Sequence, residues 1–148
     1  MAVNKENSCA FYVSDYHLEM IMLPYINENL KHNKSVYVFT QNNLEDTINT
    51  LVEKINLNNE IKDNILNINW KVDDENKYNK IIEDKKEKII FVKGNEKYIE
   101  TINKNINQIK QYQPIDVVDC YNLQEIGNNA NIISKNYKNI LTTLKINN

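Results

Sequence analysis

Arginine is absent from the 148 residues of this chain, and glycine occurs twice. Arginine binds phosphate or carboxylate through two parallel hydrogen bonds, so its absence excludes an arginine clamp for either group. A phosphate-binding loop needs glycines, because backbone N–H groups must approach the phosphates closely. Neither GxxxxGK(S/T) nor GxGxxG occurs, and the segment VSDYHLE after the first apolar run can form neither loop. The sequence therefore argues against binding of a nucleoside triphosphate in the usual way, and the GxSxG elbow of hydrolases is absent as well.

Cysteine and histidine also occur only twice each. Cys9 and Cys120 lie in apolar runs, and together with His17 and His32 they form neither a CxxC nor an HExxH motif. We therefore expect no metal and no cofactor. The two cysteines are expected to be buried free thiols, with a redox-sensing thiol as the alternative.

Long apolar runs are missing as well. No run approaches the roughly 18 residues of a transmembrane helix, and the first residues, MAVNKENS, lack the apolar region of a signal peptide. We expect a cytoplasmic protein that does not enter a membrane. The 18 lysines face 20 acidic residues, a net charge of −2, so there is no basic excess for direct binding to nucleic acid.

Short apolar runs alternate with helical patterns along the chain. The runs predict strands at 8–14, 35–40, 66–70, 89–92 and 115–120. Apolar residues at helical spacing predict helices at 16–31, 42–55, 60–65, 73–82, 95–111 and 126–144. This order predicts an α/β fold: a three-layer αβα sandwich with a mainly parallel five-stranded sheet, RecA-like or Rossmann-like. The length suits a single domain over residues 1–148.

Polar and aromatic residues follow the predicted strands, at the edge where open α/β sheets bind ligands. The candidate ligand-binding residues at this edge are Asp15, Tyr16, His17, Gln41, Trp70, Asn95, Tyr121 and Asn122. A pocket lined by Tyr16, Trp70 and Tyr121 would suit a small apolar or planar ligand. Two candidates have structural alternatives, because Asp15 can cap the following helix and His17 can be an exposed residue of its first turn.

Five segments have the order and spacing of a known family: residues 7–12 (NSCAFY), 22–26 (MLPYI), 29–30 (NL), 34–38 (KSVYV) and 117–122 (VVDCYN). Together they resemble the MEDS domain, a sensory domain named after methanogen and methylotroph proteins and the dichloromethane regulator. Asn7 stands where the family has histidine, and Asn33 where it has glycine. The resemblance implies a RecA/KaiC-like domain that has lost the phosphate loop, senses small molecules and is often fused to kinase or DNA-binding domains.

These observations lead to three functional hypotheses. The first is a non-enzymatic cytoplasmic sensory or regulatory domain that binds a small ligand, a protein partner or both, in signal transduction or transcription control. The second is a protein-interaction module with a degenerate ATPase-like fold and no ligand, which pairs with a protein partner or as a homodimer. The third is a small enzyme in which His17 acts with Asp119 or Cys120.

Overall fold

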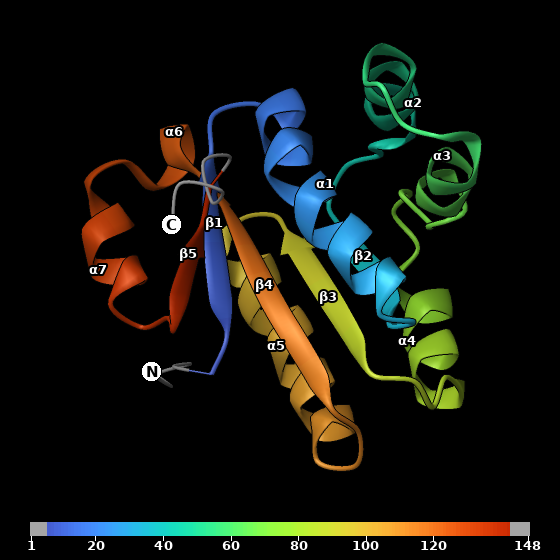
Figure 1. Cartoon of the computed structure of the whole chain (residues 1–148). Coiled ribbons are helices and arrows are strands. Elements are labelled where there is room, and N and C mark those ends of the chain that lie inside the picture. The colour runs from blue at the N-terminus through green and yellow to red at the C-terminus, as the bar shows by residue number, and fades with distance from the viewer. Residues whose placement is uncertain (1–5, 143–148) are drawn as a thin grey trace.

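A single parallel sheet forms the centre of the molecule. The structure, a computed structural model, describes residues 6–142. Within them the strands are β1 (Ser8–Tyr12), β2 (Ser35–Thr40), β3 (Lys88–Lys93), β4 (Ile115–Asn122) and β5 (Asn139–Leu141). Their order in the sheet is β2-β3-β4-β1-β5, and every neighbouring pair is parallel (Figure 1). The predicted α/β class and the parallel five-stranded sheet are confirmed.

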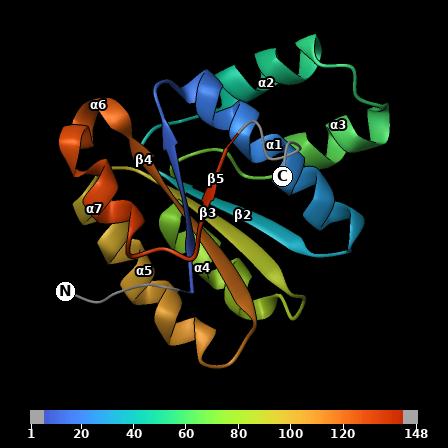
Figure 2. The ribbon, with the colours of Figure 1, turned by 60° about the vertical axis from the view of Figure 1, so that its left-hand side comes forward.

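Helices cover both faces of this sheet. They are α1 (Asp15–Lys31), α2 (Glu45–Lys54), α3 (Asn59–Leu66), α4 (Asp74–Glu83), α5 (Glu96–Lys110), α6 (Leu123–Ile126), the 3₁₀ turn η1 (Gly127–Asn129) and α7 (Ala130–Ser134). Buried residues of α1, α2 and α3 pack in one cluster, here core one, and those of α4 to α7 pack in another, core two. Figure 2 shows α1, α2 and α3 on one side of the sheet and α5 and α7 on the other. The molecule is therefore the expected three-layer αβα sandwich.

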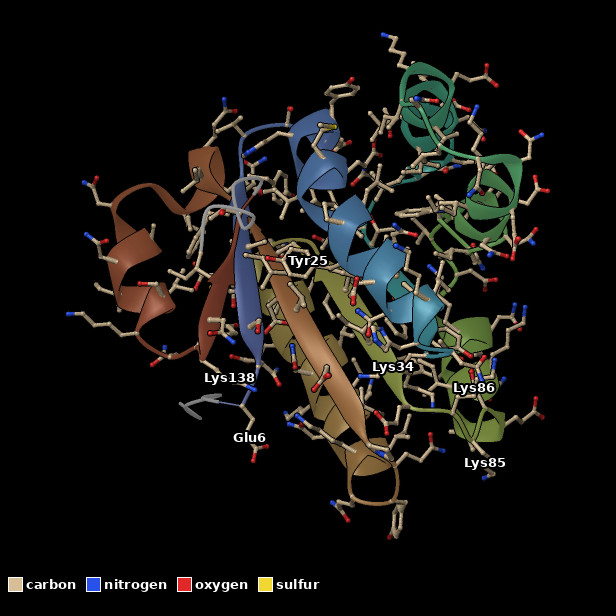
Figure 3. All side chains as sticks on the ribbon, in the orientation of Figure 1. Glu6, Tyr25, Lys34, Lys85, Lys86 and Lys138 are labelled. Carbon is tan, nitrogen blue, oxygen red and sulfur yellow. The ribbon has the colours of Figure 1, made fainter. Side chains whose placement is uncertain are left out.

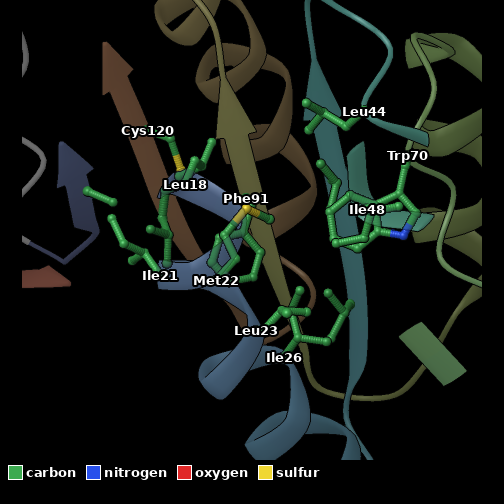
Figure 4. Close-up of a cluster of buried hydrophobic side chains, with 14 of the residues drawn as sticks. Leu18, Ile21, Met22, Leu23, Ile26, Leu44, Ile48, Trp70, Phe91 and Cys120 are labelled. Carbon is green, nitrogen blue, oxygen red and sulfur yellow. The ribbon is translucent and has the colours of Figure 1, made fainter. Parts of the chain in front are cut away.

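The central strands have both faces covered, which explains their continuous apolar runs. All six residues of β3 are buried; Ile89 and Phe91 belong to core one, whereas Ile90 and Val92 belong to core two. Figure 4 shows the α1 side chains, Met22 among them, packed over the sheet near Phe91. Helix α1 is thus anchored by apolar contact, and this fixes the position of its first turn at the end of β1.

The predicted strand at 66–70 is wrong. Leu66 is the last residue of α3, and the chain then runs without regular structure to α4. Trp70 is buried in this connection, where its indole N–H donates to the carbonyl of Ile65 at 2.8 Å. The alternation of apolar and polar residues here has a different cause: Trp70 fills core one beneath α2 and α3. Alternation over five residues does not distinguish a strand from a loop with one buried anchor.

The predicted final helix at 126–144 is also wrong. Gly127 has a φ of +54°, a conformation that favours glycine, and it ends α6 after four residues. The chain continues through η1 and α7 and then forms β5, in which Ile140 pairs with Cys9 of β1. The fifth strand of the sheet is therefore β5. Leu144, which was assigned to the predicted helix, lies outside the described residues.

Candidate functional site

The chain leaves two adjacent strands in opposite directions. From β1 it enters α1, over core one, and from the neighbouring β4 it enters α6, over core two. Such a point opens a crevice at the carboxyl ends of parallel strands, where α/β proteins bind ligands. The lysines labelled in Figure 3, Lys34, Lys85 and Lys86, lie at the opposite end of the sheet. Of the predicted site residues, Asp15, Tyr16 and His17 follow β1, and Tyr121 and Asn122 end β4.

The corner between β1 and α1 is closed by two local hydrogen bonds. The Ser14 hydroxyl caps α1 by accepting the His17 backbone N–H at 3.1 Å. The Val13 N–H donates in turn to Nδ1 of His17 at 3.1 Å. Because Nδ1 accepts, the proton of the neutral imidazole is on Nε2. Ser14 performs the capping role considered for Asp15, and the Asp15 carboxylate is directed to a different partner.

That partner is Lys93, the last residue of β3. Its ammonium lies 3.1 Å from Oδ1 of Asp15, donates to Oδ1 of Asn42 and lies 5.4 Å from the centre of the Tyr12 ring. The amide of Asn42 donates to the other carboxylate oxygen of Asp15 at 3.0 Å. The Lys93 side chain is 8% exposed, so this ion pair is weakly screened by solvent. The triad of Asp15, Asn42 and Lys93 joins the ends of β2 and β3 to the first turn of α1.

Glu19 lies one turn further along α1 and is fully buried. Its Oε2 is hydrogen-bonded to the hydroxyl of Thr47 on α2. Its Oε1 has no hydrogen-bond partner among the residues that the structure describes. Burial raises the pKa of Glu19 to about 7; the Thr47 hydrogen bond opposes this, Asp15 adds to it and Lys93 also opposes it. Glu19, Lys93 and Asn42 were not among the site residues predicted from the sequence.

A hollow of about 320 Å³ lies beside this corner, between the first turns of α5 and α6. It is lined by Gly94, Asn95, Glu96, Lys97, Asn122, Glu125 and Ile126. Two of the predicted site residues contribute: Asn95 caps α5 through the Tyr98 N–H at 2.8 Å, and Asn122 caps α6 through the Gln124 N–H at 2.9 Å. A second hollow, at the amino ends of the strands, has about 80 Å³. The larger hollow has the volume and the location of a small-ligand site.

Gln41 forms one border of this region. Its side-chain carbonyl accepts the Asn95 N–H at 2.7 Å, which joins the end of β2 to the start of α5. The same oxygen lies over Gly94, where an added Cβ would collide with it. Glycine at position 94 is thus explained by the close approach of both Gln41 and the Tyr98 ring. Of the predicted residues, Gln41 and Asn95 therefore meet at the turn that follows β3, and Asn95 and Asn122 line the adjacent hollow.

The three aromatic candidates are not brought together. Trp70 is buried in core one and Tyr121 in core two, on opposite faces of the sheet. Tyr16 is 44% exposed on the first turn of α1. The predicted aromatic pocket therefore does not form. Apart from Gly94 and Ile126, the residues that line the hollow carry polar side chains.

Asp119 belongs to a second polar network, on the side of core two. Its carboxylate accepts from the Asn103 amide at 2.8 Å and from the Tyr137 hydroxyl at 2.7 Å. The Asn7 amide donates to Oδ1 of Asn103 at 3.0 Å, and the hydroxyls of Tyr121 and Tyr137 form a hydrogen bond. Burial raises the pKa of Asp119 to about 6, although these hydrogen bonds oppose the shift. Asp119 therefore lies inside a structural network and away from the crevice.

The two cysteines lie on opposite faces of the sheet, Cys9 in core two and Cys120 in core one. Burial raises the pKa of Cys9 to about 12 and also raises that of Cys120. Both are therefore held as thiols rather than as reactive thiolates. In the described part of the chain, His17 bonds to Val13 and contacts neither Asp119 nor Cys120 through a hydrogen bond.

The fold defines a class: an αβα sandwich with an all-parallel sheet, RecA-like or Rossmann-like. No protein-family model, curated protein or solved structure matches the chain. The resemblance to MEDS domains therefore stays a prediction. Within residues 6–142 no three His, Cys, Asp or Glu side chains are grouped to hold a metal, and no helix has the length and hydropathy to cross a membrane.

Proposed function

We propose that this chain is a regulatory domain that binds a small polar ligand without transforming it. The observation that carries this proposal is the hollow of about 320 Å³ at the carboxyl ends of β3 and β4. Two amide side chains, two carboxylates and one lysine line it: Asn95, Asn122, Glu96, Glu125 and Lys97. Such a lining can fix the orientation of a ligand that carries both hydrogen-bond donors and acceptors.

The state of the chemical groups near the crevice supports binding rather than catalysis. A nucleophile needs an adjacent base or a lowered pKa, and burial has the opposite effect on Cys9 and Cys120. The Nδ1 atom of His17 is occupied by the Val13 N–H, and the Asp119 carboxylate is occupied by Asn103 and Tyr137. These contacts favour the non-enzymatic hypothesis over the one in which His17 acts with Asp119 or Cys120.

Ligand binding is tested by measuring the melting temperature with amino acids, amides and small carboxylic acids at millimolar concentration. A ligand of the folded state raises the melting temperature by mass action. We expect at least one compound to do so. The chemical-shift changes that it causes in the backbone amides of the protein should be concentrated at the starts of α5 and α6. Asn122→Ala should abolish the effect. Asn58→Ala is the matched control, because Asn58 also caps a helix, α3, through the Ile61 N–H at 2.8 Å but does not line the hollow.

An interaction module is the second candidate, because apolar side chains are exposed next to the same corner. Val13, Tyr16 and Met20 are 51%, 44% and 40% exposed, and their spacing places Tyr16 and Met20 one turn apart on α1. Sedimentation of the wild type and of Tyr16→Ser/Met20→Lys measures self-association. A dimer that dissociates in the double variant, together with no stabilising compound, would replace the ligand-binding proposal with this one.

A further inference from the structure

The contact between α1 and α2 depends on one carboxyl group. Glu19 is fully buried, and its Oε2 is joined to the hydroxyl of Thr47, which lies on α2. The same hydroxyl lies 3.0 Å from the carbonyl oxygen of Leu44. Oε1 of Glu19 has no hydrogen-bond partner within residues 6–142. A carboxyl group in this position thus has a single polar partner for its two oxygens.

The number of hydrogens available favours one protonation state. A threonine hydroxyl carries one hydrogen, and a carboxylate carries none. If Glu19 is ionised, the Thr47 hydrogen can serve either Glu19 or the Leu44 carbonyl, and one contact is left without a hydrogen. If Glu19 is a neutral acid, it donates to Thr47, and Thr47 donates to Leu44. Only the neutral acid satisfies both contacts at once.

The charges around Glu19 lead to the same result. Asp15 lies one turn earlier on α1 and repels a second negative charge. Lys93 of β3 is the nearby cation, and it already forms an ion pair with Asp15 at 3.1 Å and a hydrogen bond with Asn42. The described residues show no ion pair between Glu19 and any cation. An ionised Glu19 would thus be a buried charge with one donor, which is costly.

We propose that Glu19 is a proton-dependent lock between α1 and α2, closed when it donates its proton to Thr47 and weakened when that proton leaves. The proton that leaves Glu19 passes to solvent, and no other covalent bond is made or broken. The remaining carboxylate competes with Asp15 for Lys93. Since Lys93 and Asn42 join the ends of β3 and β2 to α1, the change reaches the carboxyl end of the sheet.

The Glu19 carboxyl group changes its protonation near neutral pH. Burial raises the pKa of Glu19 to about 7, so protons leave and return near neutral pH. The lock does not depend on ligand binding in the hollow beside α5, and the two proposals are separable. The Glu19 proposal is tested by the amide protection of α2 without any ligand, and the ligand-binding proposal by the melting temperature with added compounds.

The test combines a titration with hydrogen exchange on the intact chain. The carbon-13 resonance of the Glu19 carboxyl group, assigned by its loss in Glu19→Gln, should titrate near pH 7 rather than near its ordinary value of 4.5. Protection of the α2 amides, corrected for the intrinsic effect of pH on exchange, should fall by about tenfold between about pH 6 and about pH 8.5.

Three variants identify the group that is responsible. Glu19→Gln carries no titrating group and should keep α2 equally protected at both pH values. Thr47→Val removes the partner hydroxyl and should leave α2 poorly protected at both. Glu45→Gln removes a solvent-accessible carboxylate from α2 itself and should respond like the wild type. A Glu19 carbon that titrates near 4.5, or the same loss of protection in Glu19→Gln, would overturn the proposal.

Discussion

Two buried carboxyl groups, one on each face of the sheet, differ in how completely they are hydrogen-bonded. Asp119 accepts from Asn103 and Tyr137, whereas Glu19 contacts Thr47 through one oxygen and has no described partner for the other. Both are almost completely buried. Burial raises the pKa of each, but by itself it does not decide what each group does.

The difference lies in what each carboxyl group connects. The Asp119 network joins β4 to α5, to the segment before β1 and to the turn before β5, so it holds both ends of the described chain against the sheet. Glu19 connects two helices through one contact. Asp119, which has several donors from distant segments, is therefore a structural anchor, whereas a change in the protonation of Glu19 alters one contact between two helices. Four measurements test this contrast.

The largest effect is expected for Asp119→Ala. The substitution removes a buried carboxylate that accepts from both the Asn103 amide and the Tyr137 hydroxyl, and it should lower the free energy of unfolding by about 3 kcal/mol. Urea denaturation measures this change. Asp116→Ala, at an exposed position of the same strand, is the control and should change stability by less than about 0.5 kcal/mol. Equal effects of the two substitutions would refute the anchoring role.

The pH dependence of stability should separate the two carboxyl groups. Burial raises the pKa of Asp119 from 3.8 to about 6 and that of Glu19 from 4.5 to about 7. Because the folded protein holds these protons more tightly than the unfolded chain, the resulting stabilisation is present at low pH and is lost as the pH rises through the folded pKa. The free energy of unfolding should fall by roughly 2 kcal/mol for each group. The fall should occur between pH 3.8 and about pH 6 for Asp119, and between pH 4.5 and about pH 7 for Glu19.

Two variants assign these pH windows by denaturation at several pH values. Asp119→Asn should flatten the lower part of the stability profile, and Glu19→Gln should flatten the upper part. A profile that both variants leave unchanged would mean that neither carboxyl group holds its proton as its burial implies.

Tyr137→Phe should have a smaller effect than Asp119→Ala. It removes one hydroxyl that donates to Asp119 at 2.7 Å and also contacts the Tyr121 hydroxyl, while the Asn103 bond to Asp119 remains. We expect a loss of about 1.5 kcal/mol in the free energy of unfolding. Tyr112→Phe removes a hydroxyl from a side chain that is 84% exposed and should have almost no effect. If both substitutions were neutral, Tyr137 would not belong to the anchor.

The smallest effect is expected for Lys93→Met, which keeps the apolar stem and removes the ammonium. Asp15 is one-third exposed and can be hydrated when its partner is lost, so the free energy of unfolding should fall by only about 1 kcal/mol. Lys97→Met, at an exposed position near the hollow, is the control. A loss as large as that for Asp119→Ala would show that the Lys93 triad is an anchor of the same kind.

Part of the candidate site could be found from the sequence alone. The ends of apolar runs located Asp15, Gln41, Asn95 and Asn122, because parallel strands bring their carboxyl ends to one edge. Lys93 was missed since a lysine after IIFV resembles an ordinary strand end. Its burial is evident only when Asp15, from the first turn of α1, is seen to lie beside it.

Other errors arose where local pattern and tertiary contact disagree. Trp70 was assigned to a strand end because of alternation, yet it is an anchor of core one. Residues 139–141 have apolar spacing compatible with a helix, yet β1 offers them a free edge and they pair with it. Glu19 shares a helix face with Met22 and Ile26, but a charged side chain there gave no reason to expect burial before α2 was seen to pack against it through Thr47.

The sequence by itself determined the α/β class, the parallel sheet, the lack of a phosphate loop and the corner at the end of β1. These properties depend on short-range patterns. The turn after α1 is another local feature, in which Asn33 adopts a φ of +60° and ends the helix. The tertiary structure decided which strand completes the sheet and which of two buried carboxyl groups is fully hydrogen-bonded. The physical reason is that burial and hydrogen bonding depend on residues far apart in the chain, as in the bond between Asn7 and Asn103.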